Sequence, residues 1–151
     1  MGQQQLLLLV LATVIVGLAT VAGIQAFDEN RAQAAQDALV QRGATIASDI
    51  RSLATKSQTL GGINLAASPG ARTTARKLGY KVVSASSKNV SVAAPAAGSG
   101  STCQIKVNSG QTKTPGTAEV ICSATDAPQD VYVLLDPSSS EEIEVGFGSL
   151  P

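Results

Sequence analysis

The sequence predicts an α+β protein, in which one long N-terminal α-helix packs through its second half on a small antiparallel β-sheet. Three observations lead to this prediction. A charge-free apolar segment opens the chain, and a helical spacing of apolar residues continues past the first charges. Beyond Tyr80 the apolar spacing changes to two, which is the period of half-buried strands. The 151 residues suffice for one domain with an appendage.

The apolar segment runs for 22 residues without a charge, from Leu6 to Phe27. As a helix it would span about 33 Å, and about 20 apolar residues are enough to cross the core of a bilayer. A cleavable secretory signal has a shorter apolar region and a basic start, whereas no Lys or Arg precedes Leu6. An inserted anchor normally carries cations at its cytoplasmic flank. We therefore expect that a basic leader was removed before Met1 or lies outside this sequence.

The helical pattern continues beyond Phe27 as an amphipathic stripe, because apolar residues recur there at steps of three and four. No proline occurs in residues 1–68, and the first firm stop signal is Gly61–Gly62. We expect one helix of about 55 residues, roughly 80 Å long, with an apolar part over 1–27 and an amphipathic part over 28–57. The residues predicted to pack this helix on the sheet are Ala32, Ala35, Leu39, Ile46, Ile50 and Leu53.

Three glycines interrupt the predicted helix, at Gly17, Gly23 and Gly43. Each costs about 1 kcal/mol relative to alanine in a helix interior. In return, glycine permits a close approach between the helix backbone and a neighbour.

The remainder, 58–151, is expected to form the β domain, and its clearest local prediction is one hairpin. If Cys103 lies opposite Cys122 in an antiparallel pair, apolar residues match along one face and Lys106 meets Glu119 on the other. A slip of one residue would destroy every match. The pattern favours a disulfide formed in an oxidising compartment over two free thiols. This bond would close a 20-residue loop, which is worth roughly 3 kcal/mol.

A second hairpin is predicted from alternating apolar residues in 131–135 and 143–147, joined by turn-forming residues in 136–140. Tyr80 and Val82 alternate with Lys81, and Val90 and Val92 alternate with polar neighbours, so two further strands are expected. A short helix is predicted near 71–78. Four to six antiparallel strands would then cover the amphipathic half of the long helix.

The composition excludes most site chemistry. The chain has no histidine, eleven acids, eleven bases and four aromatic residues. The balanced charge argues against a nucleic-acid binder, and the lack of histidine removes the common metal and general-base arrangements. We expect no enzyme activity, no cofactor and no metal. Glu141, Glu142 and Glu144 are interpreted as a solvated strand face, with weak calcium binding as the alternative. Asn89 begins an N-glycosylation sequon, for which an unmodified strand is the alternative.

Charges are unevenly distributed after residue 57. All seven bases lie between Arg72 and Lys113, and all seven acids lie between Glu119 and Glu144. One interpretation is two solvated faces within one sheet. The other is a dipolar surface that meets its own copy head to tail, since such complementarity orients subunits.

The stretch GQQQLLLLVLATVIVGLATVAGI is similar to the N-terminal segment of type IV pilins. The resemblance covers residues 1–53. Beyond them it extends only to the architecture, which is a β domain with a cysteine pair that packs on the second half of a long helix. In that family a prepilin peptidase removes a basic leader after a glycine, and the new amino terminus is usually methylated. The resemblance thus implies processing and methylation at Met1 or Gln3.

Two positions depart from the family pattern. The glutamate usual at position five is replaced by Gln5, or by Leu7 if cleavage follows Gly2. A glutamine still accepts a hydrogen bond, although without the charge-assisted gain. The helix-breaking proline frequent near position 22 is replaced by Ala22, so local melting of the helix would have to come from the glycines.

The resemblance implies a structural subunit that polymerises helically into an extracellular pilus-like filament on the cell surface. Its partners would be copies of itself, the inner membrane before assembly, the prepilin peptidase and the pilus assembly machinery. The β domains would form the outer surface and the apolar helices the core. The residues expected to pack in this core are Leu6, Leu7, Leu8, Leu9, Val10, Leu11, Val14, Ile15, Val16, Leu18, Val21 and Ile24.

Two alternatives use the same N-terminal helix. The first is a membrane-tethered extracytoplasmic binding module, in which the helix is a single-pass anchor with a stalk. The second is a pseudopilin of a secretion system, which forms only short assemblies. The shortage of aromatic residues disfavours a large binding pocket and therefore the first alternative.

Overall fold

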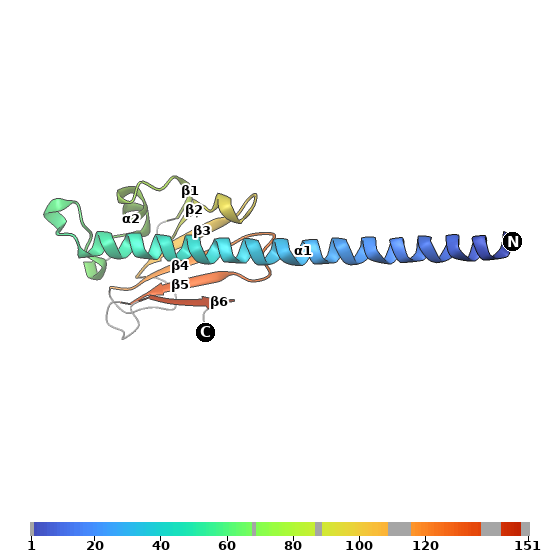
Figure 1. Ribbon diagram of the computed structural model, residues 1–151. Helices are drawn as coiled ribbons and strands as arrows, with labels where there is room; N and C mark the ends of the chain where they lie inside the picture. Colours follow the sequence, from blue (N-terminus) through green and yellow to red (C-terminus); the bar gives the residue numbers. More distant parts are fainter. Residues whose placement is uncertain (1, 68, 87–88, 109–115, 137–142, 149–151) are drawn as a thin grey trace.

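The computed structural model describes residues 2–67, 69–86, 89–108, 116–136 and 143–148. The fold is α+β, as predicted: a long N-terminal helix lies across a six-stranded antiparallel sheet and extends far beyond it (Figure 1). In chain order, the elements are α1 (Gly2–Thr55), η1 (Gln58–Leu60), η2 (Leu65–Ala67), α2 (Ala71–Lys77), β1 (Val82–Ala85), β2 (Asn89–Ala93), η3 (Pro95–Ala97), β3 (Thr102–Val107), β4 (Ala118–Ser123), β5 (Val131–Leu135) and β6 (Ile143–Phe147).

Helix α1 is one unbroken helix of 54 residues, about 80 Å long, and it runs through Gly17 and Gly23 without interruption. It ends at Thr55, two residues before the expected boundary and well before the predicted stop. The chain then turns back, and the Ile63 N–H donates to the Leu53 carbonyl at 3.2 Å. A Cβ at Gly62 would lie 2.0 Å from the Lys56 carbonyl oxygen. The glycine pair therefore shapes the turn after the helix rather than ending the helix.

The sheet is a meander with the strand order β1-β2-β3-β4-β5-β6. The predicted register of the central hairpin is confirmed: Cys103 lies opposite Cys122 in β3 and β4, and the two residues form a disulfide. Lys106 lies opposite Glu119, as predicted, with 3.5 Å between Nζ and Oε1. The Glu119 side chain is buried, with only 2% of its surface exposed.

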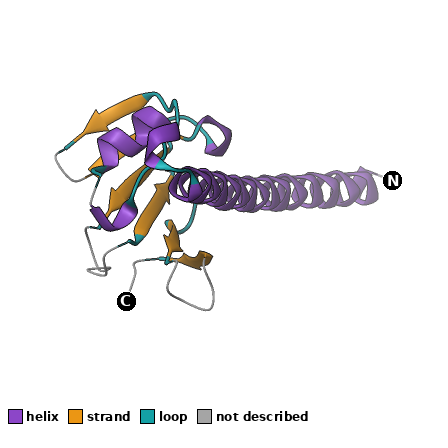
Figure 2. Ribbon diagram, turned by 90° about the vertical axis from the view of Figure 1, so that its left-hand side faces the viewer, coloured by secondary structure: helices purple, strands orange, loops and turns teal. Residues whose placement is uncertain are grey.

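Both helices cover the same face of the sheet. Helix α1 contacts β4 and β5, and α2 contacts β1, β2 and β3. Turned by 90°, the molecule shows all its strands gathered at one end of α1, with the other half of the helix pointing away from them (Figure 2). The core lies between the helices and the inner face of the sheet, and its largest helical members are Leu39, Ile46 and Ile50, which are all fully buried.

Five of the six residues predicted to pack α1 on the sheet are buried: Ala35, Leu39, Ile46, Ile50 and Leu53. Ala32 was predicted wrongly, since it is partly exposed and lies outside the core. It precedes the first buried residue of α1 by three positions, before the helix reaches the sheet.

At Gly43, α1 lies close against the sheet. A Cβ placed there would lie 2.9 Å from Val133 Cγ2 and 3.5 Å from Cys122 Sγ. The close approach expected of this glycine therefore occurs within the subunit, against β5 and the disulfide.

The predicted short helix is confirmed as α2, but the strand expected from Tyr80 begins only at Val82. Tyr80 points instead toward α1, where its hydroxyl donates to Asp49 Oδ2 and its ring lies 4.9 Å from the Arg42 guanidinium carbon. Burial raises the pKa of Tyr80 to about 12, and the hydrogen bond to Asp49 acts in the same direction. These contacts fasten the α2–β1 connection to α1.

The second predicted hairpin is also present. β5 and β6 pair antiparallel, with Val133 opposite Val145 and Val131 opposite Phe147. Of the turn expected between them, residues 137–140 lie outside the described part of the chain.

Candidate functional site: the exposed apolar half of α1

The first half of α1 is exposed along its whole described length. Every residue from Gly2 to Arg31 is exposed. The large apolar side chains of this segment, from Leu6 to Phe27, retain between 50% and 69% of their accessible surface. All twelve residues predicted for the filament core belong to this set. By length and composition, α1 can cross a membrane.

Several polar side chains in this half are satisfied by the helix itself. The Thr13 hydroxyl donates to the Val10 carbonyl and the Thr20 hydroxyl to the Val16 carbonyl, each at 2.8 Å. The Asn30 amide likewise donates to Ala26 O at 2.8 Å. A buried polar group without a partner is costly, so these internal bonds suit a segment that enters an apolar environment.

The apolar half ends at a group of charges that begins with Asp28 and Glu29. Three residues after Asp28, Arg31 forms an ion pair with Asp126 in the β4–β5 connection, at 3.1 Å. The pair is largely exposed, so it stabilises the fold only slightly, but it marks the point where α1 meets the β domain.

Two glycines in the middle of the apolar half, Gly17 and Gly23, meet nothing in the described part of the subunit. A Cβ at Gly17 or Gly23 would have no described atom within 4 Å beyond its own helix. Intramolecular packing therefore gives no reason for these residues, in contrast to Gly43.

The other predicted site residues are scattered. Asn89 lies on β2 and is partly exposed. Gln3 lies in the first turn of α1, whereas Met1 lies outside the described residues. Glu144 is exposed on β6, and its predicted neighbours Glu141 and Glu142 are also outside the described part. Within the described ranges, no group of three Asp, Glu, Cys or His residues is arranged to hold a metal.

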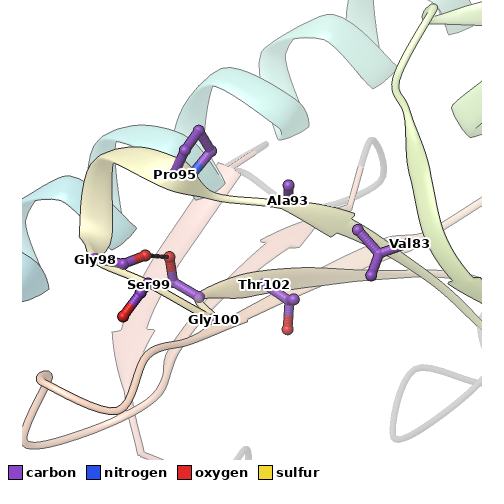
Figure 3. A pocket seen from close by; sticks show the side chains of 8 residues that line it. Val83, Ala93, Pro95, Gly98, Ser99, Gly100 and Thr102 are labelled. Carbon is purple, nitrogen blue, oxygen red and sulfur yellow. Dashed lines mark hydrogen bonds between the residues drawn. The ribbon is translucent and has the colours of Figure 1, made fainter.

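A shallow depression of about 480 Å³ lies at one end of β1, β2 and β3 (Figure 3). It is lined by Ala93, Pro95, three small hydroxyl residues and glycine backbone, with Val83 at its edge. The Ser101 hydroxyl is already bonded to the carbonyls of Gly98 and Ala94. None of the eight lining residues is titratable, so the depression has no evident catalytic chemistry.

One exposed apolar surface was missed in the sequence. Val145 and Phe147 alternate with polar residues on β6 and pair with buried residues of β5. Alternation predicts that they are covered, yet they are 40% and 54% exposed because α1 lies over β4 and β5. The alternation of apolar and polar residues within one strand does not show which strands a helix will cover.

Comparisons with protein-family models, with curated proteins and with solved structures gave no match. The class of protein is thus defined by the structure alone. It is an α+β chain with a disulfide-linked antiparallel sheet and a long helix, α1, whose exposed apolar half has membrane-spanning length. The exposed apolar helix is consistent with membrane anchoring.

Proposed function

We propose that the chain is the structural subunit of an extracellular type IV pilus-like filament. The apolar halves of α1 from many copies form the filament core, and the β domains form its outer surface. Before assembly, the same apolar half holds the subunit in the inner membrane. The resemblance of the first 53 residues to type IV pilins supports this proposal together with the structure.

The observation that carries the proposal is the contrast along α1. Its second half is buried on the sheet, whereas its first half exposes thirteen large apolar side chains. Full burial of such a side chain gains about 1.5–3 kcal/mol, so covering the set is worth more than about 10 kcal/mol. Lipid would cover these apolar side chains in a single subunit, and neighbouring helices would cover them in a polymer.

The depression of Figure 3 favours the filament over the membrane-tethered binding module. A binding module needs a surface that selects a ligand, and ligand sites combine an apolar hollow with convergent polar or charged groups. Here the depression is shallow, and none of its lining residues has a titratable side chain. Exposed Gly17 and Gly23 also favour helix neighbours, because glycine allows helices to approach closely, whereas lipid contact does not need it.

The direct test is electron microscopy of material sheared from the source cells, with mass spectrometry of its main protein. We expect thin filaments made chiefly of this chain, with the Cys103–Cys122 bond intact and a methylated terminus at Met1 or Gln3. If the chain is absent from all filaments and stays in the membrane fraction, the proposal is wrong.

A matched pair of variants separates a filament core from a lipid anchor. Gly17→Leu raises the apolarity of the helix and has open space in the subunit, so membrane insertion is retained. A packed core has no room for the added side chain, and we expect filament yield to fall at least tenfold. The control is Leu60→Ile, a change of shape without added volume at an exposed residue outside α1. Normal filaments from Gly17→Leu would argue against close helix packing at this position.

A further inference from the structure

The sheet has two open edges with exposed apolar side chains. β1 pairs only with β2, and β6 pairs only with β5, among the described strands. Val83 on β1 is 59% exposed, and Phe147 on β6 is 54% exposed. Phe147 also borders a hollow against Asp37 and its neighbours on α1. Open strand edges promote association unless they are covered or blunted.

The two edges carry opposite charge. Arg72 and Arg76 are exposed on α2, which contacts β1, β2 and β3, and exposed Lys81 directly precedes β1. The sequence has no acid between Asp49 and Glu119.

Three described acids lie on or near β6: Glu144, Asp130 and Asp37. Glu144 lies on β6 and is exposed, and Asp130 is exposed where its carbonyl accepts a hydrogen bond from the Gly148 N–H. Asp37 of α1 lies beside Phe147. The sequence has no base after Lys113, so the acidic edge has no cation of its own among the later strands.

The strand count makes the two edges geometrically compatible. In a meander of six antiparallel strands, β1 and β6 run in opposite directions. Two copies in the same orientation, placed side by side, therefore bring β6 of one next to β1 of the other in antiparallel sense. This contact joins unlike surfaces and leaves an open edge at each end, so it does not close and can repeat along a polymer.

We infer that the acidic β6 edge of one subunit docks against the basic β1–α2 edge of the next copy in the same orientation. This inference rests on the proposed filament and adds the contact between its β domains.

The register of β1 shifts between Val82 and Ser84, and such a bulge disturbs a regular backbone ladder. Recognition therefore relies on side chains: Val83 and Phe147 supply apolar area, and the charges set the orientation.

The test uses charge reversal in the full chain, produced in cells that assemble the wild-type filament. The basic-edge variant combines Arg76→Glu with Lys81→Glu, and the acidic-edge variant combines Asp130→Lys with Glu144→Lys. We expect each variant to reduce sheared filament at least tenfold, and the chain carrying all four changes to recover to within about threefold of wild type. Lys56→Glu, an exposed change after the end of α1, is the control and should leave filament yield unchanged.

Cross-linking tests the same contact without changing charge. Val83→Cys and Val145→Cys in one chain, treated with a short bis-maleimide, should give a ladder of multimers from wild-type-like filaments. Val83→Cys with Leu60→Cys is the matched control and should give none, because Leu60 lies beyond the end of α1, away from β6.

The outcomes separate the two proposals. Filaments that are unaffected by both reversals and give no ladder would overturn the edge contact and leave the filament proposal intact. A wild-type chain that forms no filament would overturn both.

Discussion

The two halves of α1 belong to one helix but have opposite surroundings. From Ala35 to Leu53 a stripe of residues is buried against the sheet, whereas from Gly2 to Arg31 every residue is exposed. The exposed half is the more apolar of the two. Apolarity alone therefore does not decide burial within the subunit. The exposed half keeps its large apolar side chains uncovered within the subunit, and the predictions below test this difference.

Removing the exposed half should have the largest effect. We expect the full chain to require detergent, lipid or assembly, and residues 28–151 to stay soluble and monomeric, because the truncation deletes the thirteen large apolar side chains but keeps the core. Gel filtration without detergent measures this. A full chain that is soluble and monodisperse without detergent would contradict this contrast between the two halves of α1.

A matched pair of isoleucine truncations in the full chain in mild detergent should differ strongly. Ile50→Ala removes a fully buried side chain and should lower the free energy of unfolding of the β domain by about 2–5 kcal/mol. Ile24→Ala changes a side chain that is 59% exposed, and should change this free energy by less than about 0.5 kcal/mol. Urea unfolding followed by circular dichroism gives both values. Equal effects would mean that the halves are not energetically distinct.

Two glycine substitutions should have opposite signs. Gly43→Ala gains about 1 kcal/mol of helix propensity, but its Cβ would lie 2.9 Å from Val133 Cγ2, and overpacking costs about 1–3 kcal/mol. We expect a net loss of stability of about 1 kcal/mol. Gly23→Ala meets open space and should be neutral or slightly stabilising. Thermal unfolding in detergent compares the two, and a stabilising Gly43→Ala would show that the helix can shift on the sheet.

The smallest effect concerns Tyr80 at alkaline pH. Its pKa is raised from 10.0 to about 12 in the folded chain, so the folded state holds the phenol proton more tightly than the unfolded state does. This contribution to stability is fully present below pH 10 and is lost as the pH rises toward 12. Tyr80→Phe should show a shallower loss of stability between these values than wild type. Phenolate absorbance identifies the titration, with Tyr132 as the only other tyrosine. Parallel pH profiles would argue against a raised pKa of Tyr80 in the folded chain.

The parts of the fold that depend on local pattern were predictable. The helix follows from its spacing of apolar residues, and the β3–β4 register follows because only one alignment matches the cysteines, the apolar residues and Lys106–Glu119 together. The apolar half of α1 was predictable as a site for the same reason, since its composition alone predicts an apolar environment.

The unpredicted features depend on contacts between distant residues. Tyr80 leaves the expected strand because its hydroxyl meets Asp49, 31 residues earlier. Val145 and Phe147 are exposed on β6, while α1 lies close against β5 and the disulfide at Gly43. No short window of sequence contains both partners of either contact, so periodicity could not reveal them.

The buried stripe of α1 also determines how the subunit would respond to mechanical load. A pull on the apolar half acts along the helix axis. The buried stripe of the same helix extends from Ala35 to Leu53, roughly 27 Å. Such a load must shear the whole contact between the buried stripe and the sheet at once, because it does not separate the residues one by one. The disulfide holds β3 and β4 together beneath this contact. A force that passes beyond the helix would next load the turn after Thr55, where the Ile63 N–H donates to the Leu53 carbonyl.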